Sequence, residues 1–298
     1  MSSLLTQNAE ALLRKLILLD MNDVANNRRQ LLSSFYGMML FLIKRLIKGC
    51  ASASQNRYPQ ILVLQRLIAN MPAALYRHAL VLVSSGQCAT AMIRLNQNIF
   101  RGHLPSRALK AWMLLDGREG VAKNYDKAII LAREGVRLGC HHCLGVLACC
   151  YHYQGNRRDC GIRQKAMRSL ELAHKSSDTG SRYGQYALGK FLRDGIGGQE
   201  KKINQAVALF QLAADQGLDR AQFELGLAFH AQDRAEALRW YQLAAAQGHP
   251  EAMYGVAYCY DKGEGVAVNY TEAIWWLQRA QAANCFIAQL DLLDCVRK

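Results

Sequence analysis

The sequence predicts an all-α protein: a solenoid of helix–turn–helix repeats preceded by a helical N-terminal extension. One segment near the C-terminus contains a complete pair of amphipathic helices with the residues that cap and turn them, and imperfect copies of that segment recur upstream. The chain has 298 residues, of which 51% are hydrophobic, so it can bury a sizeable core. It contains only four prolines and no Gly/Ser-rich linker, which argues against separate flexible domains.

The complete unit spans residues 252–280. Gly263 and Gly265 end its first helix, because glycine adopts positive φ without a steric penalty. Asn269 is the expected cap of the second helix, and Glu272, three residues later, is its capping-box partner. Such a pair cannot bury its own apolar faces and needs neighbours to stack on. These faces are formed by Ala252, Val256, Ala257 and Tyr260 in the first helix and by Ala273, Trp276, Leu277 and Ala280 in the second.

Copies of this unit recur along the chain. The motif GVAKNYDKAI at residues 120–129 returns as GVAVNYTEAI at residues 265–274, and the two copies begin 145 residues apart. That offset is close to four units with a period in the mid-thirties. The ends of the units in this stretch lie 38, 40, 31 and 36 residues apart, at Gly139, Ser177, Gly217, Gly248 and Asn284.

The repeated pattern resembles the Sel-one-like (SEL-like) repeats, relatives of the tetratricopeptide repeat. The resemblance implies a right-handed α-solenoid that serves as a protein-interaction adaptor, and it implies no chemistry. Two units depart from the pattern: 220–248 lacks the Gly-x-Gly loop, and 142–177 replaces it. The matching segments are 107–139, 182–217, 220–248 and 252–284, with a weaker match at 142–177.

The rest of the chain also reads as helical. The helices expected outside the matched repeats are 2–20, 28–48, 58–69, 72–84, 87–101 and 286–296. The pair within 72–101 has the length of a repeat without its signature. We therefore expect a basic helical region at 1–71, repeats at 72–284 with a degenerate first unit, and a capping helix at 285–298.

Charge is distributed unevenly along the chain, whose net charge is +14. Residues 1–110 hold 14 Lys/Arg and 3 Asp/Glu, whereas residues 111–298 hold 23 and 20. The basic N-terminal half is either a solvated surface or a docking surface for an acidic protein segment or an anionic membrane. Nucleic acid ranks last as a partner, because no recognised binding motif is present.

We expect no targeting signal at the N-terminus of the sequence. It shows no basic stretch before its apolar part and no small-residue cleavage site, so we expect a cytoplasmic protein. The longest apolar run, residues 31–43, is shorter than the roughly 20 residues that a membrane span requires. We interpret it as part of a buried helix, with peripheral membrane attachment through helix 28–48 as the alternative.

Five of the ten cysteines fall between residues 140 and 160. Cys140 and Cys143 have the spacing of a metal site, which Cys160 or His152 would complete. However, Cys143 occupies the small-residue position that Ala252 holds in another unit, so packing in the core is our first interpretation. A metal-binding module at Cys140–Cys160 and disulfides remain alternatives. We assign no metal ligand and no cofactor.

The functional hypothesis is a non-enzymatic adaptor that binds a protein in the concave groove of its repeats. The chain has no Gly-x-Ser-x-Gly, His-Glu-x-x-His or phosphate-loop motif, so we predict no catalytic residues. If first helices line the groove, aromatic side chains beside Lys or Arg would contact the partner, with packing between units as the alternative for each aromatic residue. The same spacing also exposes His142 and Cys149. The predicted partner-binding residues are Tyr183, Tyr186, Lys190, Arg220, Phe223, Tyr254 and Tyr258.

Overall fold

The computed structural model describes residues 72–118, 120–155, 162–196, 198, 200–283, 285–288 and 291. The chain divides into two units, Met1–Asn70 and Met71–Lys298, and all described residues belong to the second. The helices expected at 2–20, 28–48 and 58–69 therefore lie outside the described residues, as does most of the expected capping helix.

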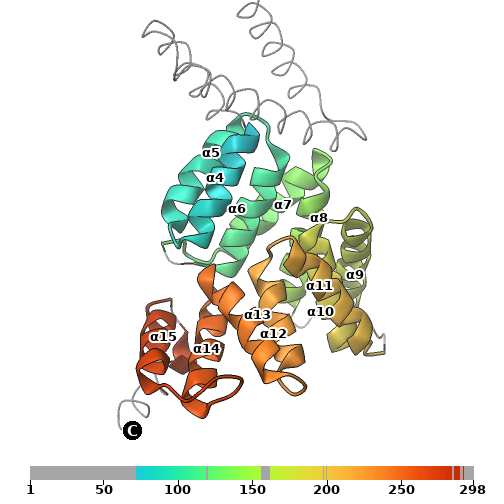
Figure 1. Cartoon of the computed structure of the whole chain (residues 1–298). Helices are drawn as coiled ribbons and strands as arrows, with labels where there is room; N and C mark the ends of the chain where they lie inside the picture. The colour runs from blue at the N-terminus through green and yellow to red at the C-terminus, as the bar shows by residue number, and fades with distance from the viewer. Residues whose placement is uncertain are drawn as a thin grey trace, which may run out of the picture. The chain divides into compact units, whose positions relative to one another are not determined.

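The described residues form helices that follow one another in packed pairs (Figure 1). Each pair packs against the next, which confirms the predicted all-α solenoid of helix–turn–helix repeats. An isolated β-bridge between Arg118 and Val121 is the one extended pairing within the described ranges. The pairs are α4 (Pro72–Ser84) with α5 (Cys88–Phe100), α6 (Leu104–Asp116) with α7 (Tyr125–Arg137), α8 (His141–Gly155) with α9 (Ile162–Asp178), α10 (Arg182–Asp194) with α11 (Ile203–Asp215), α12 (Asp219–Phe229) with α13 (Arg234–Ala246), and α14 (Pro250–Lys262) with α15 (Tyr270–Ala282).

The turn inside the last pair forms as its residues predict. Gly263 adopts the left-handed conformation at the end of α14, with a φ of 71°. Gly265 also has a positive φ, and a Cβ there would lie 2.5 Å from the backbone oxygen of Arg234. The Asn269 side chain then caps α15 by accepting a hydrogen bond from the Glu272 backbone N–H at 3.2 Å. These residues end α14 and begin α15, and Gly265 allows the turn to lie against the start of α13.

Small residues set the distance between neighbouring helices. Ala108, Ala187 and Ala221, on three of the first helices, have no exposed surface. At Gly145 of α8 the approach of α10 is closer still, because a Cβ there would lie 2.3 Å from the Gly184 backbone nitrogen. The helices therefore pack closely enough for alanine or glycine at these positions and for nothing larger.

The stack winds far enough for early and late repeats to meet. Arg182, at the start of α10, donates a hydrogen bond to the Tyr76 hydroxyl of α4 at 3.3 Å. Arg118, just after α6, donates to the backbone carbonyl of Gln247, just after α13, at 3.1 Å. These contacts bring the first two helix pairs against the later ones and create the site described next.

Candidate binding site on the inner face of the repeats

The first helices α6, α8, α10 and α12 bring side chains together on one side of the stack, which we call the inner face. Trp112 of α6 lies at its centre and is only 2% exposed. Its ring lies 5.1 Å from that of Tyr183 and 5.6 Å from that of Tyr186, both on α10, measured between centroids. The Arg220 guanidinium of α12 lies 5.5 Å from the Trp112 ring centroid, so this part of the inner face is filled by the protein's own side chains.

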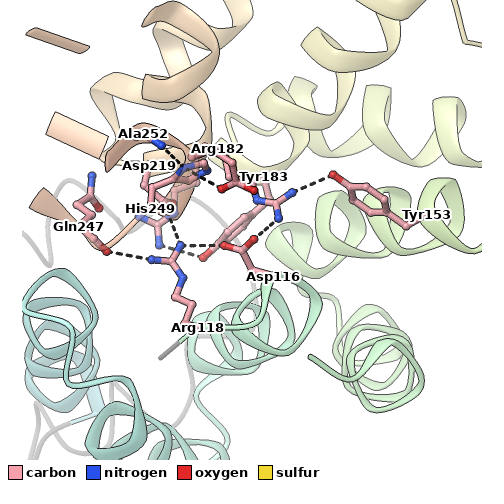
Figure 2. Close-up of polar contacts among 11 residues, drawn as sticks. Asp116, Arg118, Tyr153, Arg182, Tyr183, Asp219, Gln247, His249 and Ala252 are labelled. Carbon is pink, nitrogen blue, oxygen red and sulfur yellow. Dashed lines mark hydrogen bonds and ion pairs between the residues drawn. The ribbon is translucent and has the colours of Figure 1, made fainter. Parts of the chain in front are cut away.

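A charged network crosses the inner face beside Trp112 (Figure 2). The Asp116 carboxylate, at the end of α6, accepts hydrogen bonds from Arg220 and, at 3.1 Å, from Arg118. Arg118 also donates to the Asp219 carboxylate at the start of α12 and to the Gln247 carbonyl. The side chains of Arg118 and Asp219 are 6% and 5% exposed. The network therefore links two helix pairs, α6–α7 and α12–α13, and its Arg118–Asp219 ion pair is almost entirely withdrawn from water.

Burial and ion pairing shift the pKa values of these groups in opposite directions. Burial would raise the pKa of the Asp116 carboxyl, but the guanidinium groups of Arg220 and Arg118 outweigh it and lower that pKa to about 2. For His249, burial dominates and lowers the pKa of the imidazole. Its Nδ1 accepts a hydrogen bond from the Ala252 backbone N–H at 3.2 Å and caps α14. Near neutral pH, the network therefore holds an ionised Asp116 and a neutral His249.

Two of the predicted partner-binding residues are buried, contrary to the expectation that they would be exposed. Tyr183 and Tyr186 are 1% and 2% exposed because the winding of the stack places them against Trp112. Cys149 is likewise buried at 2% exposure. Helical spacing identifies the side of α10 that these tyrosines occupy, but it does not show that another repeat covers that side.

The other predicted residues keep part of their surface accessible. Lys190 donates a hydrogen bond to the Tyr153 hydroxyl at 2.8 Å, and Arg220 donates to the same oxygen at 2.8 Å. Partner binding by any of them remains a prediction. The partly exposed aromatic residues are Phe223 and Tyr258, together with Tyr254, whose hydroxyl donates to the Asp291 carboxylate at 2.6 Å.

Sequence reasoning missed the residues that hold the inner face together. Arg118 and Asp219 lie 101 positions apart in the chain, and Arg182 contacts Tyr76 across 106 positions. No local pattern reports such pairs, because each residue alone reads as an ordinary charged group in a turn or at a helix end.

A cavity of about 260 Å³ opens between α4, α6, α10 and the turn that precedes α12. Apolar side chains, among them Leu80, Leu109 and Leu218, form much of its wall. Arg118 and Arg182 line it as well. The cavity thus combines an apolar interior with two guanidinium groups.

The cysteines in the described part of the 140–160 segment pack inside the stack. Cys140, Cys143, Cys149 and Cys150 are all buried, and burial raises the pKa of the Cys149 thiol to about 11. Within the described ranges, no three His, Cys, Asp or Glu side chains gather as a metal site would require. Cys160, one of the two residues expected to complete such a site, lies outside those ranges.

Among the helices that the structure describes, none combines the length and the apolar character needed to cross a bilayer. The apolar helix expected at 28–48 lies outside the described residues.

Together these features define an α-helical repeat protein with a cavity on its inner face. The profile of the Sel1 repeat matches residues 108–140, 182–218, 220–249 and 250–284. The chain therefore contains Sel1 repeats at these four segments, as the resemblance of its sequence predicted. Sel1 repeats form a scaffold for protein–protein interaction, and the family is generally non-enzymatic.

Individual relatives and solved structures are similar to parts of the chain. The DAP3-binding cell death enhancer 1 of Rattus norvegicus and that of Mus musculus are each 37% identical to it over 81 residues, which is 26% of this chain and 16% of theirs. A Sel1 repeat protein from Oxalobacter formigenes is 20% identical with a TM-score of 0.47, over 73% of this chain and 86% of that one. The uropathogenic Escherichia coli antigen c5321 is 22% identical with a TM-score of 0.41, over 90% and 67%.

Proposed function

We propose that this protein is a non-enzymatic adaptor that binds a protein partner along the inner face of its last repeats. The scaffold role is a property of the repeat family. Phe223, Tyr254 and Tyr258, on α12 and α14, are partly exposed, and this observation supports the location. The tyrosines of α10 are buried in contrast. Aromatic side chains supply large rigid contact areas and are enriched among the residues that dominate binding energy.

The exposed aromatic residues sit on a rigid base. Phe223 stacks on the capping ring of His249, with 4.9 Å between centroids and 24° between planes. Tyr258 lies 6.1 Å from His230, measured in the same way. Because these neighbours already restrict the rotamers, a partner that packs on Phe223 and Tyr258 would lose little side-chain entropy on binding.

The basic region 1–71 supplies a second contact in this proposal. Its excess of Lys and Arg suits an acidic protein segment or an anionic membrane surface. The cysteines of the described residues are free thiols, which suits the reducing environment of the cytoplasm.

An affinity capture from the source lysate tests the location. The wild-type chain would be compared with Phe223→Ala and Tyr258→Ala, and with Leu243→Ala on α13 as the control. Leu243 is 49% exposed but lies on a second helix. We expect one captured protein to fall at least about tenfold with each inner-face variant, since an interface hot spot is worth 2 kcal/mol or more. Equal capture by all four chains would place the binding surface elsewhere.

A further inference from the structure

We propose that the cavity between α4, α6, α10 and the turn before α12 binds the C-terminal residue of a partner protein, with its free carboxylate and an apolar side chain. This inference rests on the proposed adaptor function and specifies which part of a partner the inner face receives. Size, charge and available hydrogen-bond donors support it independently.

The volume of the cavity suits one amino-acid residue. Its volume is about 260 Å³. Pockets for drug-sized ligands are larger, roughly 300–1,000 Å³. The walls formed by Leu80, Leu109, Met113 and Leu218 would exclude water around an apolar side chain.

Arg182 lines this cavity without a carboxylate partner. Its Nη1 donates to the Gln216 carbonyl at 3.1 Å, and its Nη2 donates to the hydroxyls of Tyr76 and Tyr183 at 3.3 and 3.0 Å. No carboxylate within the described ranges lies at ion-pair distance from it, whereas Arg118 and Arg220 both have one. Arg182 is half-buried and has no carboxylate partner among the described residues, so it is the group with which an incoming anion would pair.

The charges around the cavity leave room for one anion. Among the charged side chains that line the cavity, Arg118 and Arg182 carry two positive charges against the one negative charge of Asp219, which leaves one positive charge uncompensated. A single carboxylate balances this excess, whereas a doubly charged phosphate would exceed it.

Donors for a carboxylate are also present. An arginine has five N–H groups, and the contacts of Arg182 with described residues use three of them. Trp112 also lines the cavity and is 2% exposed, and its indole Nε1 has no hydrogen-bond partner among the described residues. A buried donor without a partner is costly, which favours a ligand that accepts from it.

A chain terminus fits this arrangement better than an internal acidic residue. In a terminal residue, the carboxylate and the apolar side chain are attached to one Cα, so both enter a cavity the size of one residue. An internal Asp or Glu would bring backbone on both sides, and its polar groups would need partners that the apolar walls do not provide.

The test uses two peptides that differ only at the terminus. The full-length chain would be titrated with a fluorescently labelled pentapeptide ending in leucine, either as the free acid or as the C-terminal amide, and binding would be followed by anisotropy. We expect the acid to bind at least about tenfold more tightly than the amide, and Arg182→Gln to remove that preference, because each charge-assisted hydrogen bond contributes a factor of this order. Equal binding of acid and amide, or no binding of the acid, would overturn the proposal.

A second variant covers the case in which Arg182→Gln fails to fold. Val81 lines the cavity and is 62% exposed on α4, so Val81→Glu places a negative charge there without disturbing the core. We expect it to weaken binding of the acid and not of the amide, with Ile130→Glu on α7, at a side chain 63% exposed, as the matched control. Equal weakening by both substitutions would count against the cavity.

The outcomes also separate this inference from the proposed function. If the inner-face variants Phe223→Ala and Tyr258→Ala leave capture unchanged while the acid still binds, the adaptor surface is misplaced but the terminus site stands. If capture depends on them while acid and amide bind equally, the adaptor proposal stands and the terminus site fails.

Discussion

The buried carboxylate of Asp116 allows the sharpest test of what holds the repeats together. Replacing it with asparagine keeps the shape of the side chain and removes its charge. Arg220 would then have no carboxylate partner among the described residues, whereas Arg118 would keep Asp219. Breaking a buried ion pair by removing one partner costs about 3–5 kcal/mol, because the remaining charge stays buried without compensation.

The expected loss is large enough to measure by standard unfolding experiments. Asp116→Asn should lower the free energy of unfolding by about 3–5 kcal/mol in urea titrations followed by circular dichroism. At roughly 2–4 °C for each kcal/mol in a domain of this size, the melting temperature should fall by roughly 6–20 °C.

An exposed ion pair supplies the control with the same chemistry. Glu171 and Lys175 pair on the surface of α9, with side chains 63% and 62% exposed. Glu171→Gln should therefore leave the free energy of unfolding almost unchanged, as is usual for surface helix pairs.

The double variant Asp116→Asn/Arg220→Met should recover part of the stability, because it removes the uncompensated charge as well. The reasoning fails if Asp116→Asn and Glu171→Gln cost the same, or if the double variant is as unstable as the sum of the two single ones.

Two further predictions concern helix ends. The Nδ1 of His103 caps α6, and burial lowers the pKa of its imidazole to about 4, compared with about 6.5 in an unfolded chain. Between these values the unfolded state binds a proton that the native state does not. The free energy of unfolding should therefore fall as the pH falls from 6.5 to 4. Asparagine can cap a helix without titrating, so His103→Asn should make the urea midpoint depend less on pH. Gly265→Ala should destabilise the protein by more than Gly102→Ala. Gly102 has a φ of 80°, which is equally unfavourable for alanine, but only at Gly265 would the new Cβ meet the backbone of Arg234. Equal melting temperatures for the two variants would contradict this reasoning.

Most of the architecture was predictable because it is encoded locally. The capping residue Asn269, the turn glycines and the apolar spacing of residues 252–280 act within a few positions of one another. A single unit can therefore be recognised from the sequence. Its copies then reveal the period. The helix pairs, the cap at Asn269 and the presence of Sel1 repeats all follow from this local information.

The candidate site depends on how far the stack winds, and that is a property of tertiary structure. The rotation between successive pairs accumulates from many small helix contacts, and no single residue specifies it. This rotation places Tyr183 and Tyr186 against Trp112, so that side chains expected on an open surface are buried. The sequence by itself determined which helices form and how they pair, because caps, turns and apolar faces act over short range. Only the tertiary structure decided that Arg118 and Arg182 line one cavity. Arg118 pairs with Asp219 and Arg182 contacts Tyr76, and each of these partners lies about a hundred residues away in the chain.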